Sequence, residues 1–407
     1  MNTIIFIGSN KSGTSREAIK AAEKMGFFTV LFTDREKFIE QREEFPDVHQ
    51  MIYLEDLQNR ESLKGHLDLL KKQGKTIKAC LSLVDPFVYT ATLLSIEMGF
   101  KHASPAAIFK MEEKTRVRKS LQNLDINPVF TVIPPHDSFE LITEKLADSL
   151  PLIVKSPQSN GSKDVILAES KRELEQGIKL LRQQFPEQAI LIEEYLNGPQ
   201  YLIEVLVWEG KVNIVGIIEQ FISKKDRFIV TGYHYPASLS ATQHEKLRVV
   251  IEEVLSALDL TIGSCHLELR WVNGEWKLIE INPRVSGGAM NQIVQEGTGI
   301  NLVQEIIRIH LGEEPDLNQS KFRHVYAQFL TVGSRGTLLR VTGKNRALSL
   351  EGVKEVYVKP RKGAILTPPY SLGDRYAYVI ASAESFHEAK KIAEQAAKEI
   401  KFLMEPL

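Results

Sequence analysis

The amino-acid sequence predicts a multidomain protein of the α/β and α+β classes, with a parallel sheet near its N-terminus and a small α+β unit near its C-terminus. Three observations lead to this prediction. The chain has 407 residues, more than one hydrophobic core ordinarily holds, so two to four domains are expected. Up to about residue 110, short apolar strands alternate with helices, which is typical of a parallel sheet covered on both faces. Beyond that point strands follow one another in hairpins.

Composition and charge exclude several classes of function. The chain is 43% hydrophobic and 25% charged with a net charge of −1, which is typical of a globular protein and gives no electrostatic footprint for nucleic acid or an anionic membrane. Cys80 and Cys265 stand outside any paired motif, so we expect no disulfide framework and a reducing, cytoplasmic setting. The first residues form an apolar run without a basic flank and predict a strand, not a signal peptide. The most apolar stretch, residues 79–100, is interrupted by Asp85 and Pro86 and is a poor membrane span.

The N-terminal elements follow from apolar runs and from residues at helical spacing. The expected strands are residues 3–7, 27–32, 51–54 and 78–84, and the expected helices are 15–25, 62–73 and 89–98. The loop "GSNKSGTS" resembles phosphate-binding loops, but Thr14 stands where a P-loop has lysine, so a tight strand-to-helix turn is favoured. Asp85 and Pro86 follow a strand at the carboxyl edge of this sheet, where ligands bind, and are expected to form the wall of a pocket.

The pattern of predicted elements changes near residue 113. A basic helix is expected at 114–123, and a final helix near 385–401 closes a strand-rich unit that starts at about 315. Between these, the expected strands are 129–133, 152–155, 165–168, 189–193, 201–208, 212–219, 264–271 and 275–282, and the expected helices are 138–146, 171–184, 242–258 and 301–311.

Two glutamates in the hairpin "CHLELRWVNGEWKLIEINPR" are candidate metal ligands. Carboxylate and amide oxygens suit Mg²⁺ or Mn²⁺, and Glu268, Glu280 and Asn282 supply them if they share one face. A two-residue Asn-Gly turn sends the two glutamates to opposite faces, so the functional interpretation requires a three-residue loop or a bulge. The alternative is an exposed polar strand face.

Two further patterns suit a nucleotide. In "PLIVKSPQSNGSKDV", a strand ends at Lys155 and is followed by a glycine-containing loop whose N–H groups can close over phosphates. In "LIEEYLNGPQYLIEV", a strand ends at Glu193 and Glu194 before Tyr195 and Leu196, a hinge that offers backbone groups to an adenine edge and a carboxylate to a ribose. Taken singly, an ordinary hairpin and a surface turn remain the alternatives.

In this order and spacing, the three patterns resemble the ATP-grasp superfamily. The motifs cover about residues 113–312, and residues 1–112 match in texture the Rossmann-like domain that usually precedes them. The resemblance implies an ATP-grasp domain over 113–312 with a mobile lid at about 128–197, and an α+β domain over 313–407. It also implies that ATP, held between two α+β subdomains with Mg²⁺ or Mn²⁺, two ions in number, activates a carboxylate as an acyl phosphate for attack by an amine.

The resemblance implies a role for individual residues. At the nucleotide it places Lys114, Lys155, Ser159, Gly161, Ser162, Lys163, Glu193, Glu194, Tyr195, Leu196 and Gln200, although many members have Glu or His where this chain has Gln200. At the metal it places Glu268, Glu280 and Asn282, and in catalysis Arg284, Lys155 and Gly288. At the substrate carboxylate it places Arg284, Ser286, Gly287 and Gly288, beside Asp85 and Pro86.

Within the superfamily, "NPRVSGGAMNQIVQEGTGIN" resembles the L-amino-acid ligases that make dipeptides, the bacilysin-synthetase type. This implies two amino acids as substrates, no nucleic-acid or membrane partner, and a homodimer as an open alternative to a monomer. His234 is a further candidate for substrate contact, with a structural role as the alternative. The alternatives for the whole chain are a carboxylating enzyme of the biotin-carboxylase or purine-biosynthesis type, and an ATP-binding protein without catalysis.

Overall fold

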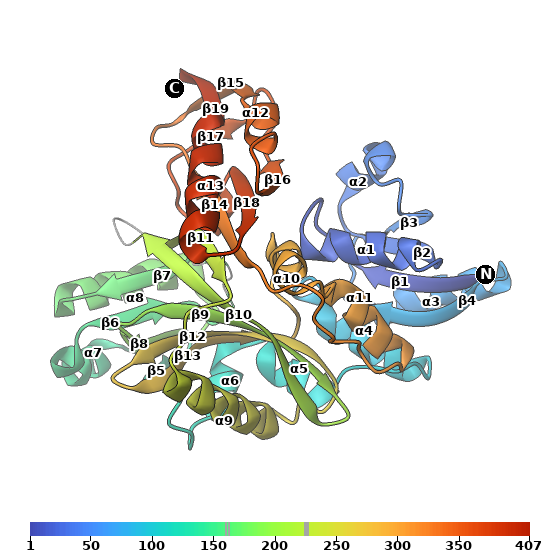
Figure 1. The fold of residues 1–407 in the computed structure, drawn as a ribbon. Coiled ribbons are helices and arrows are strands. Elements are labelled where there is room, and N and C mark those ends of the chain that lie inside the picture. The colour runs from blue at the N-terminus through green and yellow to red at the C-terminus, as the bar shows by residue number, and fades with distance from the viewer. Residues whose placement is uncertain (159–160, 162, 224–227) are drawn as a thin grey trace.

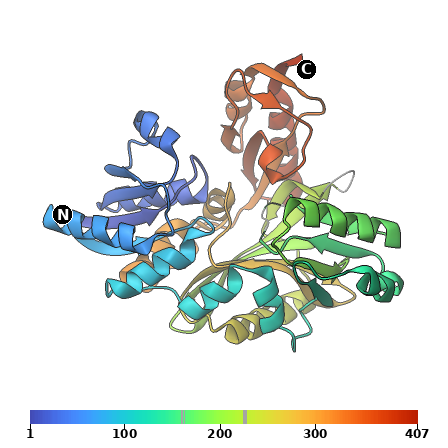
Figure 2. The same cartoon turned by 180° about the vertical axis from the view of Figure 1, so that it is seen from behind.

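The computed structural model describes residues 1–158, 161, 163–223 and 228–407. The chain forms an α/β and α+β molecule with an N-terminal part in blue, a lid in green and a C-terminal part in red, arranged around a central sheet (Figure 1). Seen from behind, the C-terminal part stands above the central sheet, between the N-terminal part and the lid (Figure 2). No helix of the described residues is long and apolar enough to cross a membrane.

The N-terminal part is a parallel sheet of order β3-β2-β1-β4 with helices on both faces. Alternation along β1 explains the two layers: Ile4 and Phe6 pack towards α1 and α11, whereas Ile5 and Ile7 pack towards α3 and α4. The elements are β1 (Asn2–Ile7), α1 (Thr14–Lys24), β2 (Phe28–Thr33), α2 (Glu36–Glu40), β3 (Gln50–Tyr53), α3 (Arg60–Lys72), β4 (Thr76–Leu81) and α4 (Phe87–Glu97). The parallel sheet predicted from the alternating pattern is confirmed.

The lid is an antiparallel sheet of order β5-β8-β6-β7 with two helices packed on one another. Helix α8 begins at a capping box, in which Ser170 and Glu173 each bond the other's backbone N–H, and it buries Leu174, Ile178 and Leu181. The elements are β5 (Phe130–Ile133), α7 (Glu140–Leu146), β6 (Leu152–Lys155), β7 (Val165–Ala168), α8 (Lys171–Gln184) and β8 (Ile190–Glu194).

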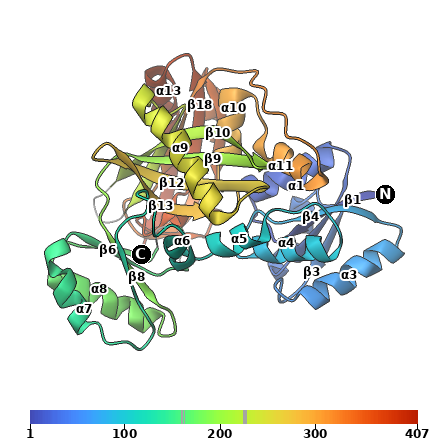
Figure 3. The ribbon, with the colours of Figure 1, turned by 90° about the horizontal axis from the view of Figure 1, so that it is seen from below.

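The central sheet has the order β13-β12-β9-β10-β11-β14-β18-β16, so strands from the C-terminal part extend it. Helix α9 lies across the underside of the strands (Figure 3), whereas α10 packs near β11, β14 and β18. The elements of this region are α5 (Pro105–Met111), α6 (Lys114–Ser120), β9 (Gln200–Trp208), β10 (Lys211–Ser223), β11 (Ile229–Tyr235), α9 (Ala241–Leu258), β12 (Gly263–Val272), β13 (Glu275–Asn282), α10 (Met290–Thr298) and α11 (Leu302–Leu311). The sequence analysis missed β11 and α10, because Gly232 interrupts the first and Gly297 the second.

The C-terminal part contributes β14, β16 and β18 to the central sheet and forms a second, small sheet of order β17-β15-β19. Helix α13 approaches the sheet closely because alanines 389, 393 and 396 form its buried face. The elements are β14 (His324–Leu330), β15 (Gly336–Thr342), α12 (Lys344–Leu348), β16 (Val353–Val358), β17 (Ile365–Leu366), β18 (Ala377–Ala383), α13 (Phe386–Glu399) and β19 (Lys401–Pro406).

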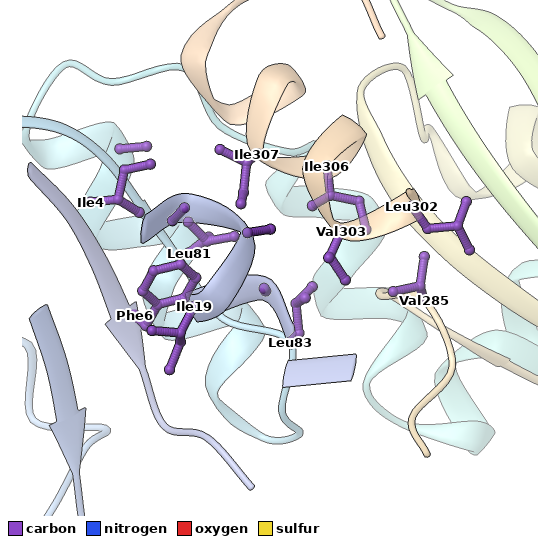
Figure 4. Packing of buried hydrophobic residues seen from close by; sticks show 14 of the residues in the cluster. Ile4, Phe6, Ile19, Leu81, Leu83, Val285, Leu302, Val303, Ile306 and Ile307 are labelled. Carbon is purple, nitrogen blue, oxygen red and sulfur yellow. The ribbon is translucent and has the colours of Figure 1, made fainter. Parts of the chain in front are cut away.

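Helix α11 connects the central region with the N-terminal sheet. Val303, Ile306 and Ile307 of this helix join one hydrophobic cluster with Phe6 and Ile19 (Figure 4). The helix expected to close the central unit therefore supplies part of the N-terminal core, and this packing fixes the N-terminal sheet beside the segment that follows β13.

Candidate active site

The two candidate metal ligands of the hairpin face each other because of a β-bulge. Asn273 and Gly274, with φ of 52° and 83°, form a two-residue turn in which Val272 pairs with Glu275. The register then shifts between Glu268 and Leu269, so that Glu268 pairs with Glu280. Of the two geometries that the sequence analysis left open, the structure has the bulge and not the longer loop.

A buried arginine holds the bulge in place. Arg118 on α6 donates from Nη2 to the carbonyl of Ile279, the extra residue, at 2.6 Å. Its Nε donates to Glu193 at 2.5 Å, so one side chain links the hairpin with the hinge strand of the lid. The metal candidates and the hinge are therefore positioned by the same group.

The paired carboxylates have opposite pKa shifts. Burial and the charge of Glu280 raise the pKa of Glu268 to about 7. Burial would also raise the pKa of Glu280, but Lys114 at 3.5 Å and the Asn282 amide at 2.9 Å outweigh it and lower the pKa to about 2. Two half-buried carboxylates that face each other, with the charge of one raising the pKa of the other, fit a divalent ion between them, and Asn282 adds an amide oxygen. The described residues contain no group of three His, Cys, Asp or Glu side chains that could hold a metal.

Lys155 ends β6 inside an ion-pair network. Its Nζ lies 2.6 Å from Glu193, and both side chains are 5% exposed. Burial lowers the pKa of Lys155 although Glu193 opposes it, while Arg118 and Lys155 together outweigh burial and lower the pKa of Glu193. One oxygen of Glu193 bonds Arg118 and the other bonds Lys155, so Glu193 positions the lysine at the cavity.

A cavity of about 350 Å³ joins these groups. It lies between the lid and the central sheet, and apolar side chains such as Ile153, Leu202 and Phe228 form part of its walls. Most of the residues predicted at the site line it: Lys114, Lys155, Gly161, Glu193, Glu194, Tyr195, Leu196, Gln200, Glu268, Glu280, Asn282, Arg284, Ser286, Gly287 and Gly288. An elongated ligand with a flat apolar end and a charged end suits this lining.

Arg284 lies where the central sheet meets the N-terminal part. Its guanidinium donates to one oxygen of Asp85, Oδ2, from Nε at 3.0 Å and from Nη2, which forms an ion pair across the two parts. Asp85 thus reaches the site through Arg284, although neither Asp85 nor Pro86 lines the cavity.

The loop after Arg284 is held in place by hydrogen bonds of Ser286 with Glu204 and Thr14. Glu204, 0% exposed, accepts the N–H of Ser286 at 3.1 Å, and burial raises the pKa of Glu204 to about 7. Thr14 donates to the carbonyl of Ser286 at 2.6 Å, and a Cβ on Gly13 would meet the backbone of Gly288 at 3.0 Å. The turn at "GSNKSGTS" therefore packs against the loop of residues 286–288, which its resemblance to a phosphate loop did not suggest.

Besides Asp85 and Pro86, two predicted residues of the described part of the chain, His234 and Lys163, do not line the cavity. His234 does not line the cavity, so the prediction that it contacts the substrate is wrong: Tyr233 faces the cavity, and because strand residues alternate, His234 faces the other side, where its ring lies tilted against Phe386 with ring centroids 4.1 Å apart. Lys163 is exposed and does not line the cavity. Ser159 and Ser162 lie outside the described residues.

Several residues that bear on the site were missed. His266 faces the cavity two positions before Glu268 and hydrogen-bonds to Asn282 at 3.2 Å, so the alternation of the strand was a usable signal. Arg270, again two positions on, donates to Gln200 at 3.0 Å. Nothing in the sequence pointed to Arg375, which comes from the C-terminal part.

Comparisons with known proteins agree with this geometry. Residues 148–292 match the family model of the ATP-grasp domain, and residues 328–405 match that of L-amino acid ligase C-terminal domain 2. A protein of Sinorhizobium fredii, y4rH, is 30% identical over 263 residues, which are 63% of this chain and 54% of that protein. The chain spans about half, or less, of the length of the curated relatives it matches.

Solved structures share the fold over the whole chain. The L-amino acid ligase from Bacillus licheniformis superposes with a TM-score of 0.84 at 22% identity, covering 100% of this chain and 99% of that one. The biotin carboxylase domain of the Hydrogenobacter thermophilus 2-oxoglutarate carboxylase, solved with MgADP, gives 0.75 at 18% identity and covers 99% and 91%. The carboxylate pair beneath a lysine-bearing lid thus lies in a fold that these structures share, and residues 148–292 match the ATP-grasp domain. The match of residues 328–405 likens the C-terminal part to the corresponding domain of L-amino acid ligases.

Proposed function

We propose that this chain is an ATP-dependent carboxylate–amine ligase that joins two L-amino acids into a dipeptide and releases ADP and phosphate. The observation that carries the proposal is the position of Arg284. It lies between the carboxylate pair of Glu268 and Glu280 and the loop at Ser286, where a transferred phosphoryl group would meet a substrate carboxylate. A protein that only binds ATP has no need of a guanidinium there.

The proposed reaction has two steps. The substrate carboxylate attacks the terminal phosphorus of ATP, which forms an acyl phosphate and releases ADP. The amine of the second amino acid then attacks the acyl carbon, phosphate leaves with its bond electrons, and the amine loses a proton. Mg²⁺ or Mn²⁺ at Glu268, Glu280 and Asn282 would neutralise phosphate charge. Lys114 and Lys155 would hold the phosphates, Gly161 would cover them, and Arg284 would bind the developing charge, with the Gly288 backbone N–H at the substrate carboxylate.

The domains follow the same assignment. Residues 1–112 would support the amino-acid site through Asp85, which orients Arg284, and 113–312 would bind ATP with the lid at about 128–197. Residues 313–407 form a third unit, for which a specific role is proposed below. The y4rH relative and the two family models support this arrangement.

The test is a screen of phosphate release over pairs of amino acids with ATP and Mg²⁺, followed by chromatography for the dipeptide. Bicarbonate with biotin serves as a control for the carboxylating alternative. Phosphate release that depends on two amino acids supports the ligase. Release with bicarbonate alone, or nucleotide binding without turnover for any pair, would count against it.

Glu280→Gln tests the proposal that Glu280 is a metal ligand. It removes one charge and one hard ligand, so ATP turnover should fall below about 1% of the wild-type rate while the thermal midpoint stays within a few degrees. Glu275→Gln is the control, because Glu275 begins the same strand, is exposed and pairs only with Lys246. Wild-type turnover in Glu280→Gln would refute the metal assignment.

A further inference from the structure

A turn of the C-terminal part reaches the nucleotide cavity. Residues 371–374 form a short closed turn, in which Asp374 accepts the N–H of Ser371 at 2.8 Å and Ser371 accepts the N–H of Gly373 at 3.1 Å. From this turn, the N–H of Leu372 donates to the carbonyl of Gly161 in the lid at 3.3 Å. Leu372 and Arg375 line the same cavity as the metal candidates. The C-terminal part therefore contacts both the lid and the space beneath it.

Arg375 is fixed on an aromatic platform. Its guanidinium carbon lies 3.9 Å from the ring centroid of Phe329 and 5.7 Å from that of Tyr233. Nε donates to the carbonyl of Leu372 at 3.2 Å, and Nη1 lies 3.5 Å from the hydroxyl of Tyr233. These contacts orient the planar group and satisfy only part of its five donors.

Arg375 has no acidic partner among the described residues, whereas three other cations of the cavity have one: Lys114 has Glu280, Lys155 has Glu193 and Arg284 has Asp85. Arg270 also has neutral partners, Gln200 and the carbonyl of Leu196, but it is buried, whereas Arg375, which lines the same cavity, is half-buried. A cation held rigid beside a cavity with free donors is a site for an anion.

We propose that Arg375 binds the terminal phosphate of ATP, so that the C-terminal part completes the nucleotide site. The inference rests on the proposed function, in which the cavity holds ATP. The turn that carries Arg375 contacts Gly161, in the loop expected to cover the phosphates, whereas the substrate loop is held by Glu204 and Thr14 on the other side. The planar fork of arginine can hold two phosphoryl oxygens at once.

The experiment compares two nucleotides in the full-length protein by calorimetry, Mg²⁺–ADP and the Mg²⁺ complex of the non-hydrolysable β,γ-imido analogue of ATP. Arg375→Ala should weaken the analogue by roughly 10–100-fold, the loss expected for hydrogen bonds to a charged group, and leave ADP within about twofold. Arg375→Lys should fall between, because the charge remains and the fork is lost. Arg340→Ala is the control, since Arg340 is exposed on β15 of the same part.

The two proposals fail in distinguishable ways. Equal weakening of both nucleotides, or of neither, in Arg375→Lys overturns the role of Arg375, and this variant decides if Arg375→Ala does not fold. The proposal is also overturned if an Arg375 variant has a higher KM for one amino acid and an unchanged ratio of the two nucleotide affinities. Arg375 would then bind the carboxylate of that amino acid and not the phosphate. The wild-type protein could bind the ATP analogue more tightly than ADP, lose this preference in the Arg375 variants, and still form no dipeptide. That result would count against the ligase proposal alone, because the ratio of the two nucleotide affinities is measured without turnover.

Discussion

The ion pair of Arg284 and Asp85 joins the central region and the N-terminal part at the site. Two donors of the guanidinium bond the same oxygen of Asp85, so Asp85 keeps the guanidinium oriented. A carboxylate substrate would compete with Asp85 for the same donors. Replacement of Arg284 therefore tests the transfer step more than nucleotide binding.

Arg284→Lys should lower kcat by roughly 10²–10³ and change ATP affinity little, because a lysine cannot hold two oxygens and the nucleotide keeps its other contacts. Steady-state kinetics of dipeptide formation and calorimetry with the ATP analogue measure the two quantities. Arg346→Lys, exposed and paired with Glu399, is the control. A variant with an unchanged kcat at saturating substrate would exclude the assigned role.

Glu204 allows a prediction about pH. Burial raises its pKa from 4.5 to about 7 in the folded protein, so between these values the unfolded chain releases the proton more readily and stability falls as pH rises. Glu204→Gln removes this loss and keeps an acceptor for Ser286. The free energy of unfolding of the variant should match the wild type near pH 4.5 and exceed it near pH 8 by on the order of 1–3 kcal/mol.

Urea denaturation at both values of pH measures the effect, with the exposed Glu245→Gln on α9 as the control. A difference between Glu204→Gln and the wild type that is the same at pH 4.5 and pH 8 would contradict the raised pKa.

The hairpin of β12 and β13 is the element on which the site depends. A regular hairpin with this turn would separate Glu268 and Glu280, and the bulge at Ile279 restores them to one face. The tight turn is also required, because it fixes the register from which the bulge starts. Asn273 has a φ of 52°, a conformation that Asn and Gly accept more readily than other residues.

Asn273→Ala should therefore lower the free energy of unfolding by about 1 kcal/mol, because an alanine Cβ is strained in the left-handed region. Asn273→Gly should remain within about half of that change, since glycine adopts this φ freely. Chemical denaturation of the two variants beside the wild type provides the comparison. If both lost stability equally, a lost side-chain contact and not backbone strain would be the cause.

The parts of the molecule are joined by helices and strands that pack into a neighbouring part. Helix α11 completes the core of the N-terminal sheet (Figure 4), and β14, β16 and β18 extend the central sheet. The site uses this interlocking, because Asp85 comes from the N-terminal part, Glu280 from the centre and Arg375 from the C-terminal part.

Ile307→Ala should destabilise the protein by about 2–5 kcal/mol, because Ile307 is 0% exposed and the N-terminal core would keep a cavity. It should also weaken amino-acid-dependent turnover, since Asp85 depends on the same packing. Leu180→Ala on α8 is the control, because Leu180 is 52% exposed and should change stability by less than about 0.5 kcal/mol. Thermal unfolding and phosphate release measure both effects, and equal stability of the two variants would contradict the role of α11.

The sequence by itself determined the class of the fold and most of the candidate residues that line the cavity. Lys155, Glu193 and Glu268 stand at strand ends or on alternating strand positions, and such positions are set by local periodicity and turn residues. The prediction for His234 was wrong because the periodicity of its strand, β11, was not recognised, so the face of the sheet on which His234 lies was not known.

Only the tertiary structure decided which distant groups meet. The sequence left the loop and the bulge open, because the register of β13 is fixed by Arg118, whose position depends on α6 and the lid. It did not indicate that Glu193 serves Lys155, that Thr14 supports Ser286, or that Arg375 reaches the cavity. These contacts join segments far apart in the chain, and their geometry follows from the packing of whole sheets and helices, which no local pattern encodes.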